Sequence, residues 1–328
     1  MSDTAPVRQR HRDEGRDLSY PPLPEALVVS VYDNHTHLEI FPTGTASTSL
    51  RDAKEPAGRG PDGEEPLDYR EQLDRASSVG IRGVVQVGTD VETSRWSAET
   101  AAIEPRMLAA VAIHPNEAPE LDGRGELDDG LAAIAELAGR PRVRAVGETG
   151  LDFFRTAEAG RAAQLRSFEA HIEIAKQHDL ALQIHDRDAH AEVIATLKRV
   201  GAPERTVFHC FSGDAELAGI CADNGWYMSF AGNVTFKNAH NLRDALEAAP
   251  RALLLVETDA PFLTPVPFRG RPNAPYLVPH TLRAMADHLG TDVSMLAAQI
   301  TSNSQLVYGR WDSEPISSPE TGPIGAVA

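Results

Sequence analysis

The sequence has few cysteines and no long apolar run, and both shortages exclude whole classes of protein. Its two cysteines, Cys210 and Cys221, are too few for a disulfide framework, which favours a reducing compartment. No stretch of about 18 apolar residues occurs, so no membrane span is predicted. Residues 1–25 also lack the apolar centre of a signal peptide. We therefore expect a cytoplasmic protein.

Positive charge is scarce relative to negative charge. The chain has 31 lysines and arginines against 48 aspartates and glutamates, which gives a formal net charge of −17. Such a chain repels polyanions at long range, which argues against an extended grip on duplex DNA. A short contact with nucleic acid stays open where bound cations reverse the local sign. The charge balance therefore argues more strongly against a DNA-binding module than against a nuclease.

The order of apolar runs predicts the fold. Eight short runs that suit buried parallel strands alternate with helical segments. The expected strands span 27–32, 83–87, 107–113, 143–146, 181–184, 206–208, 226–230 and 253–256. The expected helices span 68–78, 131–138, 162–178, 189–198, 214–223, 241–248, 278–288 and 293–306. This order and size indicate an α/β fold, a (β/α)8 TIM barrel, with a doubly wound open sheet as the structural rival.

The alternation of strands and helices is unbroken by any linker, so residues 26–311 are expected to form one domain. The polar segment 1–25 is expected to be a mobile extension, and the segment 312–328, rich in Ser, Pro and Gly, a mobile tail. An irregular insertion, 43–66, follows the first strand. We expect this insertion to cap the entrance of a site at the strand ends.

Ligand-type side chains lie at the C-terminal ends of five expected strands, where the chemistry of such barrels is found. The first strand leads into His35 and His37, which are two residues apart and so point to the same side. The other strand ends contribute Glu148, His185, His209 and Asp259. Mixed imidazole and carboxylate ligands suit Zn²⁺ or Mn²⁺ and admit Mg²⁺. Six ligands exceed the need of one catalytic ion, so we expect two divalent ions per chain that share a carboxylate.

Further polar residues near these strand ends have expected roles with alternatives. Asp259 is the candidate for orienting water and accepting its proton, the alternative being a plain metal ligand. His114 and Arg187 are expected to bind substrate, with turn packing and a rim salt bridge as their alternatives. For Arg269 and Arg271 a solvated surface position is the expectation.

Asp33 and Glu257 each lie two residues before a ligand and are expected to face the barrel interior. They are expected either to orient the ligands or to satisfy buried hydrogen-bonding groups. Cys210 directly follows His209, so strand alternation is expected to turn it away from the ions and into the packing.

Six stretches, taken in order, resemble the TatD family of metal-dependent deoxyribonucleases, which belongs to the amidohydrolase-like barrels. They are DNHTHL at 33–38, AIHP at 112–115, VGETGLD at 146–152, IHDRDA at 184–189, HCFSG at 209–213 and ETDAP at 257–261. The resemblance covers about residues 28–310. It implies that His35, His37 and Asp259 hold one ion, that His185 and His209 hold the second, and that Glu148 bridges them. The chain departs from the family pattern at Glu39, at Asp186 and in the insertion 43–66.

The expected function is therefore a metal-dependent hydrolase that cleaves phosphodiester bonds of DNA by metal-activated water, with 3′–5′ exonuclease action as one form. Its partner would be single-stranded DNA or strand ends, and the protein would be a monomer or a weak oligomer. The alternative is a metal-dependent amide or ester hydrolase acting on a small molecule. Such barrels often bridge their ions with a modified lysine, and no lysine lies at an expected strand end. A non-enzymatic protein with a structural metal would need a closed coordination shell.

Overall fold

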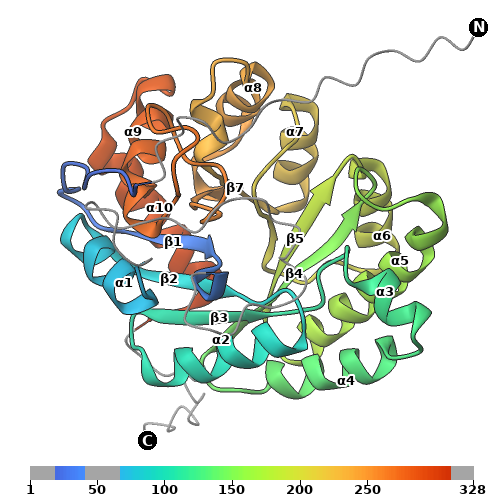
Figure 1. The fold of residues 1–328 in the computed structure, drawn as a ribbon. Helices are drawn as coiled ribbons and strands as arrows, with labels where there is room; N and C mark the ends of the chain where they lie inside the picture. Colours follow the sequence, from blue (N-terminus) through green and yellow to red (C-terminus); the bar gives the residue numbers. More distant parts are fainter. Residues whose placement is uncertain (1–18, 41–66, 312–328) are drawn as a thin grey trace, which may run out of the picture.

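Eight parallel strands form one sheet in which each strand pairs with the next along the chain (Figure 1). The computed structural model describes residues 19–40 and 67–311. The strands are β1 (Val31–Thr36), β2 (Ile81–Val87), β3 (Met107–Val111), β4 (Val143–Asp152), β5 (Ala181–Arg187), β6 (Thr206–Phe208), β7 (Tyr227–Phe230) and β8 (Leu254–Val256). A parallel bridge between Thr36 and Ala260 brings the residues after β8 back to β1. The predicted barrel is confirmed, and the open sheet is excluded.

Helices cover the outside of this sheet (Figure 1). They are α1 (Tyr69–Ser78), α2 (Val91–Ile103), α3 (Ala118–Gly123), α4 (Leu127–Ala138), α5 (Glu158–Gln177), α6 (His190–Val200), α7 (Ala215–Asn224), α8 (His240–Ala248), α9 (Val278–His288) and α10 (Val293–Tyr308). Short 3₁₀ turns are η1 (Leu38–Ile40), η3 (Gly232–Thr235), η4 (Arg251–Leu253) and η5 (Pro275–Leu277). The eight expected helices are confirmed within a few residues. None of the described helices combines the length and the apolar character that crossing a membrane requires.

Helix α2 was not predicted, because its buried face lacks an apolar stripe. That face is built largely from small residues, including Ser94, Ser97, Ala98 and Ala101. Their size allows the helix to approach the sheet closely: a Cβ on Gly88 would lie 2.4 Å from the Cα of Ser94. A capping box formed by Asp90 and Thr93 marks its start. The capping box, rather than the spacing of apolar residues, is the sequence signal that marks this helix.

Strand β1 begins and ends later than predicted. The expected 27–32 was wrong at its start, because Val28 is 92% exposed and the pairing with β2 begins at Val31. The strand continues through Asp33, Asn34, His35 and Thr36, all of which are fully buried. The barrel interior supplies partners for some of these polar groups; Asn34 Nδ2, for example, donates to Val256 O at 2.7 Å.

The barrel interior is closed at the N-terminal end of the strands by a hydrophobic plug, which we define as Val307, Tyr308 and Trp311. These side chains join the inner apolar cluster formed by strand residues such as Val85 and Leu108. The Trp311 ring stacks on Tyr32 with centroids 3.9 Å apart, and its Nε1–H donates to Val84 O at 3.0 Å. The opposite end of the strands is free for the polar residues.

Residues 19–25 were expected to belong to a mobile extension, but they pack on the barrel. Tyr20 is buried, and the Tyr276 hydroxyl donates to Pro21 O at 2.6 Å. The Arg271 guanidinium donates to the carbonyl oxygens of Ser19 and Tyr20. The remainder of the extension, the insertion 43–66 and the tail 312–328 lie outside the described residues.

Candidate metal centre

His35 and His37 meet as the strand alternation predicted. Their Nε2 atoms lie 3.1 Å apart, although His37 stands one residue beyond the end of β1. His37 Nδ1 lies 2.9 Å from Val87 O. Because a carbonyl oxygen only accepts, Nδ1 must carry a proton, and Nε2 is the ring nitrogen directed at His35. Asp259 Oδ1 lies 3.8 Å from His35 Nε2 and 3.7 Å from His37 Nε2.

Glu148 lies between two groups of imidazoles and divides its carboxylate between them. Oε1 faces the first pair, at 3.4 Å from His37 Nε2 and 3.8 Å from His35 Nε2. Oε2 faces the second pair, at 2.8 Å from His209 Nε2 and 3.0 Å from His185 Nδ1. Glu148 stands within β4, which extends beyond its predicted end at residue 146. The register between β4 and β5 shifts at this point, between Val146 and Thr149. The side chains expected from five strand ends therefore converge on one carboxylate.

The spacing of these atoms fits a divalent cation. Ligand atoms that bind one ion at about 2.1 Å lie about 3.0–3.4 Å from each other in octahedral or tetrahedral shells. The distances among His35, His37, Asp259 and Glu148 fall at or slightly above this range. Two of the clusters of ligand-type atoms in the described chain contain Glu148, one with His35 and His37 and one with His114 and His185. This donor set suits Zn²⁺ or Mn²⁺.

Asp33 and Glu257 contact the ligand-type histidines from behind. Asp33 Oδ1 accepts from the backbone N–H of His35 at 3.3 Å and of Thr258 at 2.8 Å, which ties β1 to the segment after β8. Glu257 Oε1 lies 3.3 Å from His209 Nδ1, which leaves His209 Nε2 directed at Glu148. Each carboxylate thus orients a ligand and also satisfies buried donors, so the two expected roles coincide.

The electrostatics of the centre favour protonation of some of its imidazoles, among them His37 and His209, in the absence of an ion. Burial lowers the pKa of His209, but the adjacent Glu148 carboxylate more than reverses this and raises the pKa to about 10. Burial likewise lowers the pKa of His37, and Asp259 and Glu148 raise it well above its ordinary value. Burial raises the pKa of Glu148, whereas His209 and His185 hold it well below its ordinary value. A cation that binds here must displace protons, so its affinity is expected to fall as the pH falls.

His114 lies at the edge of the centre, 3.6 Å from Glu148 Oε2 through its Nε2. Its Nδ1 accepts the backbone N–H of Asn116 at 3.0 Å, and burial lowers its pKa to about 3. The neutral ring therefore carries its proton on Nε2, which makes that atom a donor. This favours the predicted contact with substrate over metal ligation, although His114 belongs to one of the ligand-type clusters.

The three arginines singled out in the sequence differ in their surroundings. Arg187 stands at the end of β5 with its Cζ 4.1 Å from the Phe154 ring centroid, and no carboxylate partner is found for it among the described residues. The alternative of a rim salt bridge is therefore not found within the described part of the chain. Arg269 is exposed beside Phe236, as expected for a surface residue. Arg271 anchors the N-terminal segment, a role the sequence did not indicate.

Two residues of the centre were given no role in the sequence. Asp152 Oδ2 lies 3.3 Å from His185 Nε2 and thereby directs His185 Nδ1 at Glu148. His171, in α5, accepts Ile113 N–H at 3.1 Å, and its Nδ1 lies 3.0 Å from Thr149 Oγ1. Asp152 could have been found from its place four residues after Glu148, whereas His171 lies in a helix that gives no such signal.

Cys210 does not follow the strand alternation that was expected to turn it away. Strand β6 ends at Phe208, and Cys210 has a φ of 42°. Burial raises the pKa of its thiol, and the charges of Asp259 and Glu257 raise it further. Its thiol is therefore kept protonated beside the centre, with the Asn233 amide 3.9 Å away.

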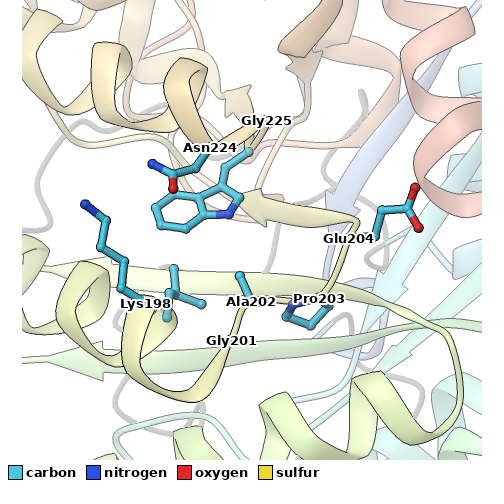
Figure 2. A pocket seen from close by; sticks show the side chains of 9 residues that line it. Lys198, Gly201, Ala202, Pro203, Glu204, Asn224 and Gly225 are labelled. Atoms are coloured by element: carbon cyan, nitrogen blue, oxygen red, sulfur yellow. The ribbon is translucent and has the colours of Figure 1, made fainter.

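A surface pocket of about 590 Å³ lies at the other end of the barrel, where the chain enters β6 and β7. It is lined by residues such as Lys198, Ala202, Pro203 and Trp226, and Figure 2 shows Lys198 and Glu204 at its opposite sides. None of the clusters of ligand-type atoms in the described chain includes a residue of this pocket. The chemistry therefore concentrates around Glu148.

Comparisons with known proteins point to one family. The family model described as TatD related DNase matches residues 32–309. A metal-dependent hydrolase named TatD from Mycobacterium tuberculosis is 41% identical over 281 residues, which cover 84% of this chain and 97% of the relative. A 3′-5′ ssDNA/RNA exonuclease TatD from Citrobacter rodentium is 33% identical over 252 residues, 74% of this chain and 92% of its own. The crystal structure of YjjV, a TatD homolog from Escherichia coli, shares the fold with a TM-score of 0.68 at 24% identity, covering 85% of this chain and 98% of its own.

Proposed function

The chain belongs to the TatD family of metal-dependent hydrolases, and from that premise we propose that it cleaves phosphodiester bonds of nucleic acid at single strands or strand ends. The division of the Glu148 carboxylate between two groups of imidazoles carries this proposal. His35, His37 and Asp259 would hold one divalent ion, and His185 and His209 a second, with Glu148 between them. Such ions, when bound, lower the pKa of water and neutralise the charge that develops on a phosphate.

The residues of the chain supply the other requirements of the reaction. Asp259, whose side chain is 13% exposed, is the carboxylate placed to orient the attacking water and accept its proton. The Nε2–H of His114 is directed into the centre and can donate to a phosphate oxygen. Arg187 brings a guanidinium that is not neutralised by a described carboxylate. A donor and a cation beside two metal positions suit an anionic phosphodiester better than a neutral amide.

The Citrobacter rodentium relative named as a 3′-5′ ssDNA/RNA exonuclease supports the choice of nucleic acid. The acidic surface of this chain fits a substrate that touches only the rim of the barrel, because an extended grip on a duplex would meet repulsion. We propose action from the 3′ end because that relative is named as a 3′-5′ exonuclease. The small-amide reaction remains as an outcome of the test.

The test is hydrolysis of single-stranded oligonucleotides with added Mg²⁺, Mn²⁺ or Zn²⁺ by the wild type, His35→Ala and Asp259→Ala. We expect metal-dependent cleavage by the wild type and loss of cleavage in both variants. His178→Ala is the control, since His178 is an exposed residue between the end of α5 and the start of β5, at the opposite end of the barrel, and it should keep full activity. Turnover of a small amide without cleavage of any oligonucleotide would refute the proposal.

A further inference from the structure

Phe154 presents an exposed aromatic ring at the rim of the barrel. Its side chain is 63% exposed, and the other aromatic side chains of the described chain are buried or partly buried. It lies two residues after the end of β4, at the C-terminal end of the strands where the metal centre is built. A single exposed apolar residue needs no explanation by itself. The residues around Phe154 provide such an explanation.

The guanidinium of Arg187 lies over the Phe154 ring, 4.1 Å from its centroid. The two residues come from neighbouring strand ends, because the register of β4 and β5 pairs Asp152 with Arg187. In a chain with 48 acidic and 31 basic residues, an arginine at the rim could readily have been given a carboxylate. Among the described residues it contacts an aromatic ring and no carboxylate, so its positive charge stays available to an anion.

The ring is fixed relative to the metal centre through one carboxylate. Asp152 Oδ2 lies 3.3 Å from the ligand His185, and Asp152 Oδ1 accepts the backbone N–H groups of Phe154 at 3.0 Å and Arg155 at 2.8 Å. The Asn116 amide donates to Oδ2 at 3.1 Å and holds the carboxylate in place. The turn that carries Phe154 is therefore tied directly to the residue that orients His185.

We propose that Phe154, with Arg187 stacked on it, is a position on which a nucleobase of a bound single strand stacks. This rests on the proposed nuclease function and names the substrate feature that the rim recognises. An aromatic face beside an arginine is the arrangement that binds single-stranded nucleic acid, because every base has a face to stack and every nucleotide a phosphate to pair. A base inside a duplex has no free face, so the position favours single strands and frayed ends.

The test uses two variants and a series of oligonucleotides. Phe154→Leu removes the ring and keeps an apolar side chain, whereas Phe154→Tyr keeps the ring. The substrates are one single-stranded oligodeoxynucleotide and its analogues in which a single abasic residue is moved along the strand. We expect Phe154→Leu to lower kcat/KM about tenfold on the unmodified strand, through KM, because a base–aromatic stack is lost. Phe154→Tyr should resemble the wild type.

The abasic series separates stacking from other roles. For the wild type, one abasic position should cause the same loss as Phe154→Leu, and on that substrate the variant should lose nothing further. A disturbed phosphate contact of Arg187 would persist on the abasic strand and would overturn the proposal, as would wild-type kinetics of Phe154→Leu. Met295→Ala, which removes an apolar side chain 70% exposed on α10, is the control and should change no rate. A wild type that cleaves no oligonucleotide would refute the nuclease function itself, whereas an active wild type with an unchanged Phe154→Leu refutes only the stacking position.

Discussion

The two ends of the barrel bury very different side chains within the same eight strands. At the C-terminal end, imidazoles and carboxylates face each other around Glu148. At the N-terminal end, the hydrophobic plug of Val307, Tyr308 and Trp311 packs against apolar strand residues and fills the interior. Apolar packing stabilises a fold. Buried carboxylates and imidazoles whose charges are only partly balanced do not contribute stability in this way. The comparison indicates that stability comes from the closed, N-terminal end of the barrel and reactivity from its open, C-terminal end.

Substitution at the open end should give the largest effect on activity. Replacing the bridging carboxylate by Glu148→Gln should lower the rate on the order of 10³-fold or more, because both imidazole groups lose their shared anion. The thermal unfolding midpoint should change little by comparison. Steady-state kinetics with a single-stranded oligonucleotide, together with calorimetry, would measure both. Glu136→Gln, at an exposed position on α4, should leave both quantities unchanged.

Substitution at the closed end should give the opposite result. Trp311→Ala removes the ring stacked on Tyr32 and leaves a cavity in the plug, so the free energy of unfolding should fall by about 3–5 kcal/mol. The kcat/KM of the molecules that remain folded should stay at the wild-type level. Trp96→Ala, which removes a partly buried ring on α2, should cost less stability in the same urea titration. A Trp311→Ala enzyme that is stable but inactive would contradict the division between the two ends.

A smaller loss is expected where a residue only orients a ligand. Asp152→Asn weakens the contact with His185 Nε2, so metal affinity should fall about 10–100-fold. Titration calorimetry of the metal-stripped protein with Mn²⁺ would report the change. Asp122→Asn, at an exposed carboxylate paired with Arg166, is the matched control and should bind the ion as the wild type does. Equal affinity of the two variants would remove Asp152 from this role.

The smallest effect is a dependence of metal affinity on pH. With its pKa raised to about 10, His209 of the ion-free protein is protonated at neutral pH, and an ion must displace that proton. Raising the pH therefore tightens binding, by about tenfold from pH 7 to 8 for each proton released. Trp311→Ala should show the same slope, because no group of the plug takes part. Binding heats that do not vary with the ionisation enthalpy of the buffer would argue against proton displacement.

The fold was predictable because eight buried apolar runs carry a strong signal, and the meeting of the six ligand-type residues was predictable because they follow those runs. The limits of β1 and β4 were not, because Asp33, His35 and Glu148 lie inside strands, at points where the pairing register shifts and polar residues are held by contacts inside the barrel. The tautomer of His114 was equally hidden, since it depends on the backbone N–H of Asn116. Such contacts arise only when distant segments meet.

Diffraction from crystals soaked in Mn²⁺, recorded with the anomalous signal of manganese, tests the central claim most directly. We predict one peak among His35, His37, Asp259 and Glu148, and a second among Glu148, His185 and His209. Peaks only at the surface, or none within coordination distance of the Glu148 carboxylate, would contradict the metal centre and the hydrolytic function built on it.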